Sequence, residues 1–157
     1  MDNFDKLYQK ALFFLSFRPR SEKEIRDYLK KKKADDQTSE KIIQSLKENN
    51  FINDKDFADW FIEQRTIIKP KAQRVIKMEL KRKGIANDLI EQLLIETPNT
   101  DLAKAKKLAE KRIQRYGNVE DRRKVFEKMA RYLASKGFDY DVIKEVIDQV
   151  FGKEYND

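Results

Sequence analysis

Leu80-Lys81-Arg82-Lys83-Gly84-Ile85, followed by the apolar pairs Leu89-Ile90 and Leu93-Leu94, is the stretch that decides the fold. The same arrangement stands about 50 residues earlier, at Leu29–Ala34, and about 50 residues later, at Leu133–Phe138. Each copy indicates the end of one helix, a break, and a second helix with paired apolar residues. The repeat predicts an all-α fold, an elongated curved array of three tandem three-helix repeats that resemble helix-turn-helix units. In such an array, function is expected on a surface before a pocket.

Helix start and stop signals divide the array. Residues Ser21 and Glu24 form a capping-box pattern at the start of the second expected helix, because each side chain can pair with a backbone N–H of the first turn. We expect three three-helix repeats at 1–53, 54–97 and 98–157.

Composition supports a helical protein and narrows its chemistry. Of 157 residues, 40% are charged, 39% are hydrophobic, and only 4 are Gly and 3 Pro, which disfavours a sandwich or an α/β enzyme. No apolar run approaches the length needed to span a membrane, so we expect no membrane partner and a cytoplasmic location as the default.

The absent residues argue against catalysis. Without Cys or His the chain has no thiolate nucleophile, no imidazole base and no ordinary zinc site. Its four glycines do not form a phosphate-binding loop, and Glu79, with no second acid nearby in sequence, is better explained as a solvated residue on a helix face than as a metal ligand. We expect no catalytic residue, no metal, no cofactor and no enzymatic activity.

The net charge of +7 is unevenly distributed. Between Arg65 and Lys83 only Glu79 is acidic, and the middle helices of the other repeats share the basic bias. Two of the closing helices are acidic instead. Residues 84–103 contain no Lys or Arg, and the last helix holds Asp139, Asp141, Glu145 and Asp148 against Lys144. If the repeats stack in register, one side of the array is positive and the other negative.

A basic stripe of this kind suits a polyanion. Lysines near the end of one helix can be explained by the helix dipole alone, but the dipole does not explain why all three middle helices share the bias. Binding through phosphates would tolerate sequence and weaken steeply with salt, because its main gain is counterion release. No complete signature for reading specific bases is present.

Three groups of residues carry a resemblance to a known family. They are Ala11-Leu12, Ser21-Glu22-Lys23-Glu24-Ile25 and Tyr28-Leu29 in the first repeat, Phe51-Ile52-Asn53-Asp54, Phe57-Ala58, Trp60-Phe61-Ile62 and Lys83-Gly84-Ile85 in the second, and Tyr132-Leu133, Lys136-Gly137-Phe138 and Val142-Ile143 in the third. In their order and spacing these residues resemble the RecX family, the bacterial regulators of the RecA recombinase. The resemblance covers essentially the whole chain.

The resemblance implies an array that lies in the groove of the RecA filament on single-stranded DNA. Such a protein limits filament extension or promotes disassembly, and so lowers ATP hydrolysis, strand exchange and co-protease activity in recombination, DNA repair and the SOS response. The implied partners are the RecA filament and single-stranded DNA, with weaker binding to duplex DNA, and the protein is expected to be a monomer. The expected interaction face comprises Arg65, Lys69, Lys71, Arg74, Lys81, Arg82 and Lys83, and then Arg18, Arg20, Lys30, Lys31, Lys32 and Lys33.

Two positions depart from the family pattern. Lys33 stands where the first repeat often has Gly, which implies a different exit from that helix. Ala72 stands where the middle repeat commonly has Gly, so the entry to the next helix is expected to be set by Pro70.

Two other functions fit the same sequence. One is a sequence-tolerant helical DNA-binding protein, which would bind naked duplex DNA about as well as a filament. The other is a solenoid-type protein-interaction scaffold, for which DNA would be irrelevant. A salt titration separates them, since about 5 phosphate contacts on a single strand give a log–log slope of roughly −3 to −4.

Overall fold

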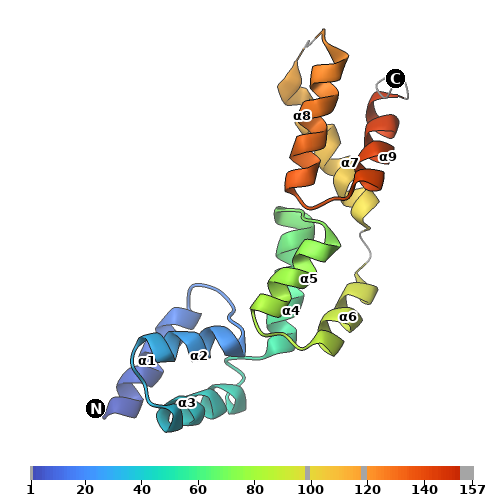
Figure 1. Ribbon diagram of the computed structural model, residues 1–157. Helices are drawn as coiled ribbons and strands as arrows, with labels where there is room; N and C mark the ends of the chain where they lie inside the picture. Colours follow the sequence, from blue (N-terminus) through green and yellow to red (C-terminus); the bar gives the residue numbers. More distant parts are fainter. Residues whose placement is uncertain (1, 98–99, 118–119, 153–157) are drawn as a thin grey trace. The chain divides into compact units, whose positions relative to one another are not determined.

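The computed structural model describes residues 2–97, 100–117 and 120–152. Within these ranges the protein has nine α-helices and no strand (Figure 1). The helices are α1 (Asn3–Leu15), α2 (Glu22–Lys31), α3 (Asp36–Glu48), α4 (Asp54–Glu63), α5 (Gln73–Arg82), α6 (Asn87–Glu96), α7 (Asp101–Arg112), α8 (Arg122–Ser135) and α9 (Tyr140–Phe151). A π-helical turn (Gln64–Ile68) extends α4, and a 3₁₀ turn (Ile113–Tyr116) extends α7. The predicted all-α fold of tandem three-helix repeats is confirmed.

The chain forms two compact units that do not coincide with the three repeats. The first unit contains residues 1–61 and 79–93, and the second contains 62–78 and 94–157. The boundary therefore passes through α5, whose residues 73–78 belong to the second unit and 79–82 to the first. The repeat boundaries at 1–53, 54–97 and 98–157 stay a prediction.

Helices α1, α2 and α3 lie together in the first unit (Figure 1). Their apolar stripes close over one core, which consists of Leu7, Ala11, Ile25, Leu29, Ile42, Ile43, Leu46 and Ile52. The predicted capping box at the start of α2 is confirmed. The Ser21 hydroxyl accepts a hydrogen bond from the Glu24 N–H, and the Glu24 carboxylate accepts one from the Ser21 N–H, both at 3.1 Å.

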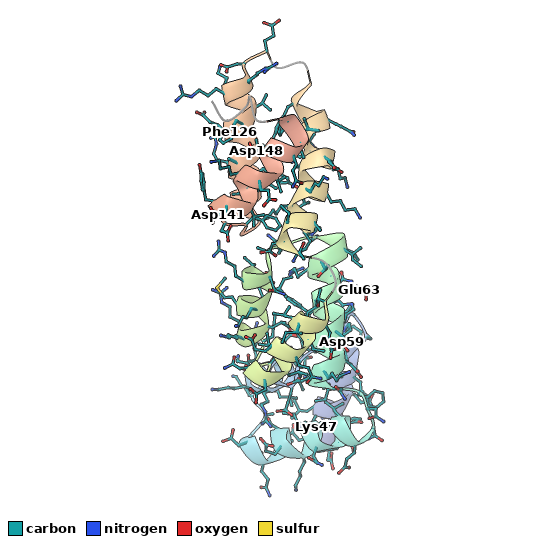
Figure 2. The ribbon with its side chains drawn as sticks, turned by 90° about the vertical axis from the view of Figure 1, so that its right-hand side faces the viewer. Lys47, Asp59, Glu63, Phe126, Asp141 and Asp148 are labelled. Atoms are coloured by element: carbon teal, nitrogen blue, oxygen red, sulfur yellow. The ribbon has the colours of Figure 1, made fainter. Side chains whose placement is uncertain are left out.

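Helices α7, α8 and α9 form the corresponding set in the second unit (Figure 1). Their core consists of Ala72, Ala105, Ala109, Met129, Leu133, Phe138, Ile143, Val146 and Ile147. Phe126 of α8 is half-buried against this core (Figure 2). Burial of these side chains supplies most of the free energy that holds the set together, because short helices are marginal on their own.

The middle helix of every repeat ends in the same backbone motif. Lys33, Gly84 and Gly137 all have positive φ, at 65°, 81° and 94°. After each of them, an N–H bonds back to the carbonyl five residues earlier: Ala34 to Leu29 at 3.0 Å, Ile85 to Leu80 at 3.1 Å and Phe138 to Leu133 at 3.3 Å. These are Schellman motifs. The expectation that Lys33 gives α2 a different exit is wrong, because Lys33 adopts the left-handed conformation that glycine adopts in the other two repeats.

Lys33→Gly should stabilise the protein by about 0.5–1 kcal/mol. A left-handed backbone strains a residue with a Cβ by about 1–2 kcal/mol, and the greater freedom of glycine in the unfolded chain offsets part of this gain. Urea unfolding followed by circular dichroism measures the difference. Lys31→Gly, at the last residue of α2 before the left-handed turn, is the control and should instead cost up to roughly 1 kcal/mol. A loss of stability in Lys33→Gly would contradict the assigned backbone conformation.

A carboxylate from the following repeat caps the middle helix of the preceding one. At the start of α2, the Glu22 N–H donates to Asp54 at 2.8 Å, and at the start of α5, the Gln73 N–H donates to Asp101 at 2.9 Å. Ala72 is fully buried, and its N–H donates to the Lys136 carbonyl at 2.9 Å. The hydrogen bonds of Ala72 and Gln73 thus hold the entry to α5, which begins three residues after Pro70, and a role of Pro70 at this entry stays a prediction.

Candidate functional site

The basic residues predicted for the interaction face fall into groups with different roles. Arg18 and Arg20, in the first unit, make contacts within the protein that stabilise the fold. Arg18 donates to both oxygens of Glu24 and to the Pro19 carbonyl, the latter at 2.7 Å, and its guanidinium lies 5.8 Å from the centre of the Trp60 ring. Arg20 donates to the Phe14 carbonyl at 3.2 and 3.3 Å. Both guanidinium groups are therefore engaged by the protein itself.

Glu24 is the centre of this network. Its carboxylate also lies 3.3 Å from the ammonium group of Lys83, another predicted face residue. Burial raises the pKa of Glu24, but the hydrogen bonds from Arg18 and the Ser21 N–H and the charge of Lys83 outweigh burial, so the pKa lies below its usual range. The network ties the end of α5 to the start of α2 within the first unit.

Glu24→Gln should lower the free energy of unfolding at neutral pH by about 1–2 kcal/mol, because the amide loses the charge-assisted hydrogen bonds. A carboxylate with a lowered pKa stabilises the fold above its unfolded pKa of about 4.3 and loses this effect as pH falls through the folded value. The two proteins should therefore converge in stability in acid. Urea unfolding between neutral pH and about pH 3 tests this. Glu110→Gln, on an exposed position of α7, is the control, and a pH-independent gap for Glu24→Gln would contradict the assignment.

Arg74 has a structural contact in the second unit. Its Nε donates to the Gly137 carbonyl at 2.6 Å, which fixes the start of α5 to the turn between α8 and α9. Charge reversal at Arg74 would therefore disturb the fold as well as any binding surface. Variants that test binding should leave Arg74 unchanged.

The remaining predicted residues of the first unit lie at helix ends. Lys30, Lys31, Lys32 and Lys33 are exposed at and just after the end of α2, and Lys81 and Arg82 are exposed at the end of α5. The helix dipole favours positive charge at both places. This exposure leaves the lysine charges accessible to an external polyanion.

In the second unit, the predicted face residue Lys69 lines a cavity of about 290 Å³. Five further cations line the same cavity, namely Lys107, Lys111, Arg112, Arg115 and Lys136. Burial, together with the neighbouring charges of Lys71, Arg112 and Lys69, lowers the pKa of Lys136. Arg65 and Lys71 are half-buried in this unit. The predicted residues Lys69 and Lys71 thus lie near other cations, such as Lys136, that the expected interaction face did not include.

A spacing of four residues could have identified part of this cavity. Lys107, Lys111 and Arg115 follow one another at this interval along α7 and its 3₁₀ extension, which places them on one face. The pairing of this face with Lys69 and Lys136, by contrast, depends on contacts between segments far apart in the chain.

Lys104 is a buried cation. A count of charged residues in the sequence does not distinguish it from an exposed lysine. Its side chain is 4% exposed, and its ammonium group donates to the Lys71 carbonyl at 2.7 Å and lies 3.5 Å from Asp101. Burial lowers its pKa, and the Asp101 carboxylate partly opposes this effect. Lys104 is a structural residue that fixes α7 to the segment before α5.

Acidic side chains gather on α9. Asp141 is exposed and Asp148 is half-buried on this helix (Figure 2), while Asp139 caps its start by accepting a hydrogen bond from the Val142 N–H at 3.1 Å. The acidic residues of the last closing helix therefore include side chains that are exposed at the surface. The arrangement of positive and negative charge on opposite sides of the whole array stays a prediction.

The described residues contain neither a metal-binding cluster nor a membrane-spanning helix. Among these residues no cluster of three or more Asp, Glu, His or Cys side chains is arranged to hold a metal ion. No helix in the same part of the chain is both long and apolar enough to cross a membrane.

Comparison with known families gives three matches in chain order. Residues 8–46 match the first three-helix domain of RecX, 53–94 match the second, and 99–147 match the third. Regulatory protein RecX of Streptococcus equi subsp. equi is 36% identical over 141 residues, which are 90% of this chain and 54% of that protein. Regulatory protein RecX of Oceanobacillus iheyensis is 34% identical over 157 residues, 99% of this chain and 57% of that protein. The chain spans about half the length of these curated relatives.

Solved structures agree with the sequence matches. The crystal structure of RecX from Lactobacillus salivarius shares 33% identity and a TM-score of 0.72, with 94% of this chain and 96% of that one aligned. A second crystal structure, of a regulatory protein RecX, gives 32% identity and a TM-score of 0.68 over 94% of this chain and 72% of that one. With all three domains matched in order and the fold shared, this chain is a member of the RecX family of regulatory proteins.

Proposed function

We propose that this protein is a negative modulator of the RecA recombinase. It binds in the groove of the RecA filament on single-stranded DNA and limits filament extension or promotes disassembly, which lowers ATP hydrolysis, strand exchange and co-protease activity. It acts by binding rather than by catalysis, as a monomer in the bacterial cytoplasm. The observation that carries the proposal is the ordered match of all three RecX domains across residues 8–147.

The exposed lysines supply a mechanism for attachment. Lys30, Lys31 and Lys81 lie at the C-terminal ends of α2 and α5, where they add to the attraction of a polyanion without being engaged as Arg18 and Arg74 are. Contacts of this kind fix position on phosphates and do not read bases. Such contacts would give the sequence tolerance that a regulator of a filament on any DNA sequence needs.

Two alternatives make different predictions. A sequence-tolerant DNA-binding protein has the same lysines but no preference for a recombinase filament. A solenoid-type scaffold would use the apolar surface of the first unit, where Phe13, Phe17 and Phe51 are 65%, 68% and 52% exposed, and would ignore DNA.

Binding measurements on three labelled substrates separate these functions. Fluorescence anisotropy would compare a naked single strand, a duplex of the same length, and the single strand coated with the cognate RecA and a non-hydrolysable ATP analogue. The proposal predicts the tightest binding to the coated strand and a steep salt dependence. Equal affinity for naked duplex would favour the general DNA-binding function, and no binding to any of the three would favour the scaffold.

A further inference from the structure

The cation-lined cavity of the second unit has a composition that differs from an ordinary solvated surface. Of the eleven residues that line its 290 Å³, six are Lys or Arg and none is Asp or Glu. Like charges gathered around one cavity repel each other unless an anion joins them. The cavity therefore favours a ligand with more than one negative charge.

An apolar rim lies beside these cations. Ile67 and Ile68 line the cavity and are each 62% exposed. They belong to the π-helical turn that extends α4. Just after this turn, the Lys69 N–H donates to the Gln64 carbonyl at 2.9 Å. Such π-helical turns are rare and occur frequently at functional sites. Two adjacent isoleucines in this position give the cavity an apolar contact area that phosphates alone would not use.

The aromatic residue of the cavity is poorly placed for stacking on a nucleobase. The Arg112 guanidinium lies 4.3 Å from the centre of the Tyr132 ring, and the Lys136 ammonium group lies 5.5 Å from it. Cations thus occupy the ring face that a base would need. The Nε of Arg112 is buried and has no hydrogen-bond partner among the described residues.

We propose that this cavity docks an acidic peptide segment of a partner protein, with carboxylates bound by Lys107, Lys111 and Arg115 and an adjacent large apolar side chain packed on Ile67 and Ile68. Charge complementarity selects the acidic segment, because carboxylates accept charge-assisted hydrogen bonds from Lys and Arg. The apolar rim selects a peptide over a phosphate backbone. This site goes beyond the proposed function, since it gives the protein a contact with a protein partner that does not depend on DNA.

Direct binding of a synthetic peptide tests the site without any recombinase. The probe is a short fluorescein-labelled peptide in which several aspartates flank a Leu-Phe pair, and a second peptide replaces that pair by Ser-Ser. The intact protein should bind the first peptide at least about tenfold more tightly than the second, a difference of about 1.4 kcal/mol, because the Leu and Phe side chains leave water when they pack on the isoleucines.

Matched variants locate the binding. The double substitution Ile67→Ser and Ile68→Ser should weaken peptide binding about tenfold, whereas Ile95→Ser, at an isoleucine 82% exposed outside the cavity, should not. Lys107→Glu should weaken it, whereas Lys106→Glu, with the same charge change on a neighbouring exposed position that does not line the cavity, should have little effect. All five positions are exposed, so circular dichroism should report intact helices.

Two results would overturn the proposal. The first is the absence of peptide binding up to millimolar concentration. The second is complete displacement of the peptide by a poly-thymidine strand together with unchanged peptide affinity in the Ile67→Ser and Ile68→Ser variant, since the cavity would then be a phosphate subsite. Neither result depends on filament inhibition, so failure of this site and failure of the proposed function are distinguishable.

Discussion

Replacing Lys30, Lys31 and Lys81 together by Glu should weaken binding to the recombinase-coated single strand about 100-fold at about 0.1 M salt. Each phosphate contact on a single strand contributes roughly 0.7 to the log–log salt slope, so three lost contacts lower the slope by about 2 and the affinity by about two orders of magnitude at that salt. All three side chains are exposed, at the ends of α2 and α5. The anisotropy titration on the coated strand, repeated at several salt concentrations, measures both quantities.

The matched control reverses the same number of charges elsewhere in the first unit. Lys6 and Lys10 on α1 and Lys41 on α3 are exposed, and their joint replacement by Glu changes the net charge equally. If binding depends on the helix-end lysines, this control should keep most of its affinity and its salt slope. Equal losses in both triple variants would mean that overall charge, rather than these positions, governs attraction.

Gly137→Ala should destabilise the protein by about 3 kcal/mol or more. The added Cβ would overlap with Cγ2 of Val75 and lie 3.4 Å from the Cβ atoms of Val75 and Ala72. The backbone there has a φ of 94°, a conformation that L side chains rarely adopt. Overpacking and left-handed strain each cost on the order of 1–3 kcal/mol, and the site is buried, so neither can relax easily.

Gly117→Ala is the control that measures the cost of an unfavourable backbone conformation without the cost of close packing. Gly117 also has a positive φ, of 56°, but no atom lies within 4 Å of its ideal Cβ position. With its φ of 56° and ψ of −143° it should cost about 1–3 kcal/mol, less than Gly137→Ala, because the added Cβ meets no other atom. Urea unfolding of both variants compares the two costs, and similar losses would contradict the close packing of Gly137 against Val75.

Much of the fold could be predicted because local signals agree with the tertiary contacts. The apolar spacing of the first three helices and the capping box of Ser21 and Glu24 each depend on residues close in the chain, and the structure confirms them. Lys33 shows where this approach fails. Sequence statistics favour Gly at a helix exit, yet the backbone hydrogen bonds of the Schellman motif and the packing after α2 impose the same conformation on a lysine.

The candidate site was harder to predict, because charge can be counted from sequence but its partners cannot. Arg18 and Arg74 look like any other members of a basic stripe, yet the first is bound to Glu24 and the second to the Gly137 carbonyl, 63 residues away. Lys104 is equally ordinary in sequence and is buried. The cavity around Lys69 and Lys136 draws its residues from segments far apart in the chain, so only tertiary structure brings them together.

The most direct test of the central claim is the single-strand-dependent ATPase of the cognate RecA, measured with this protein added at far less than one copy per recombinase monomer. If the protein limits filament growth or promotes disassembly, each bound molecule affects many RecA subunits, and ATP hydrolysis should fall markedly. Unchanged hydrolysis even with excess protein, while the protein still binds single-stranded DNA, would contradict the proposed control of RecA filaments.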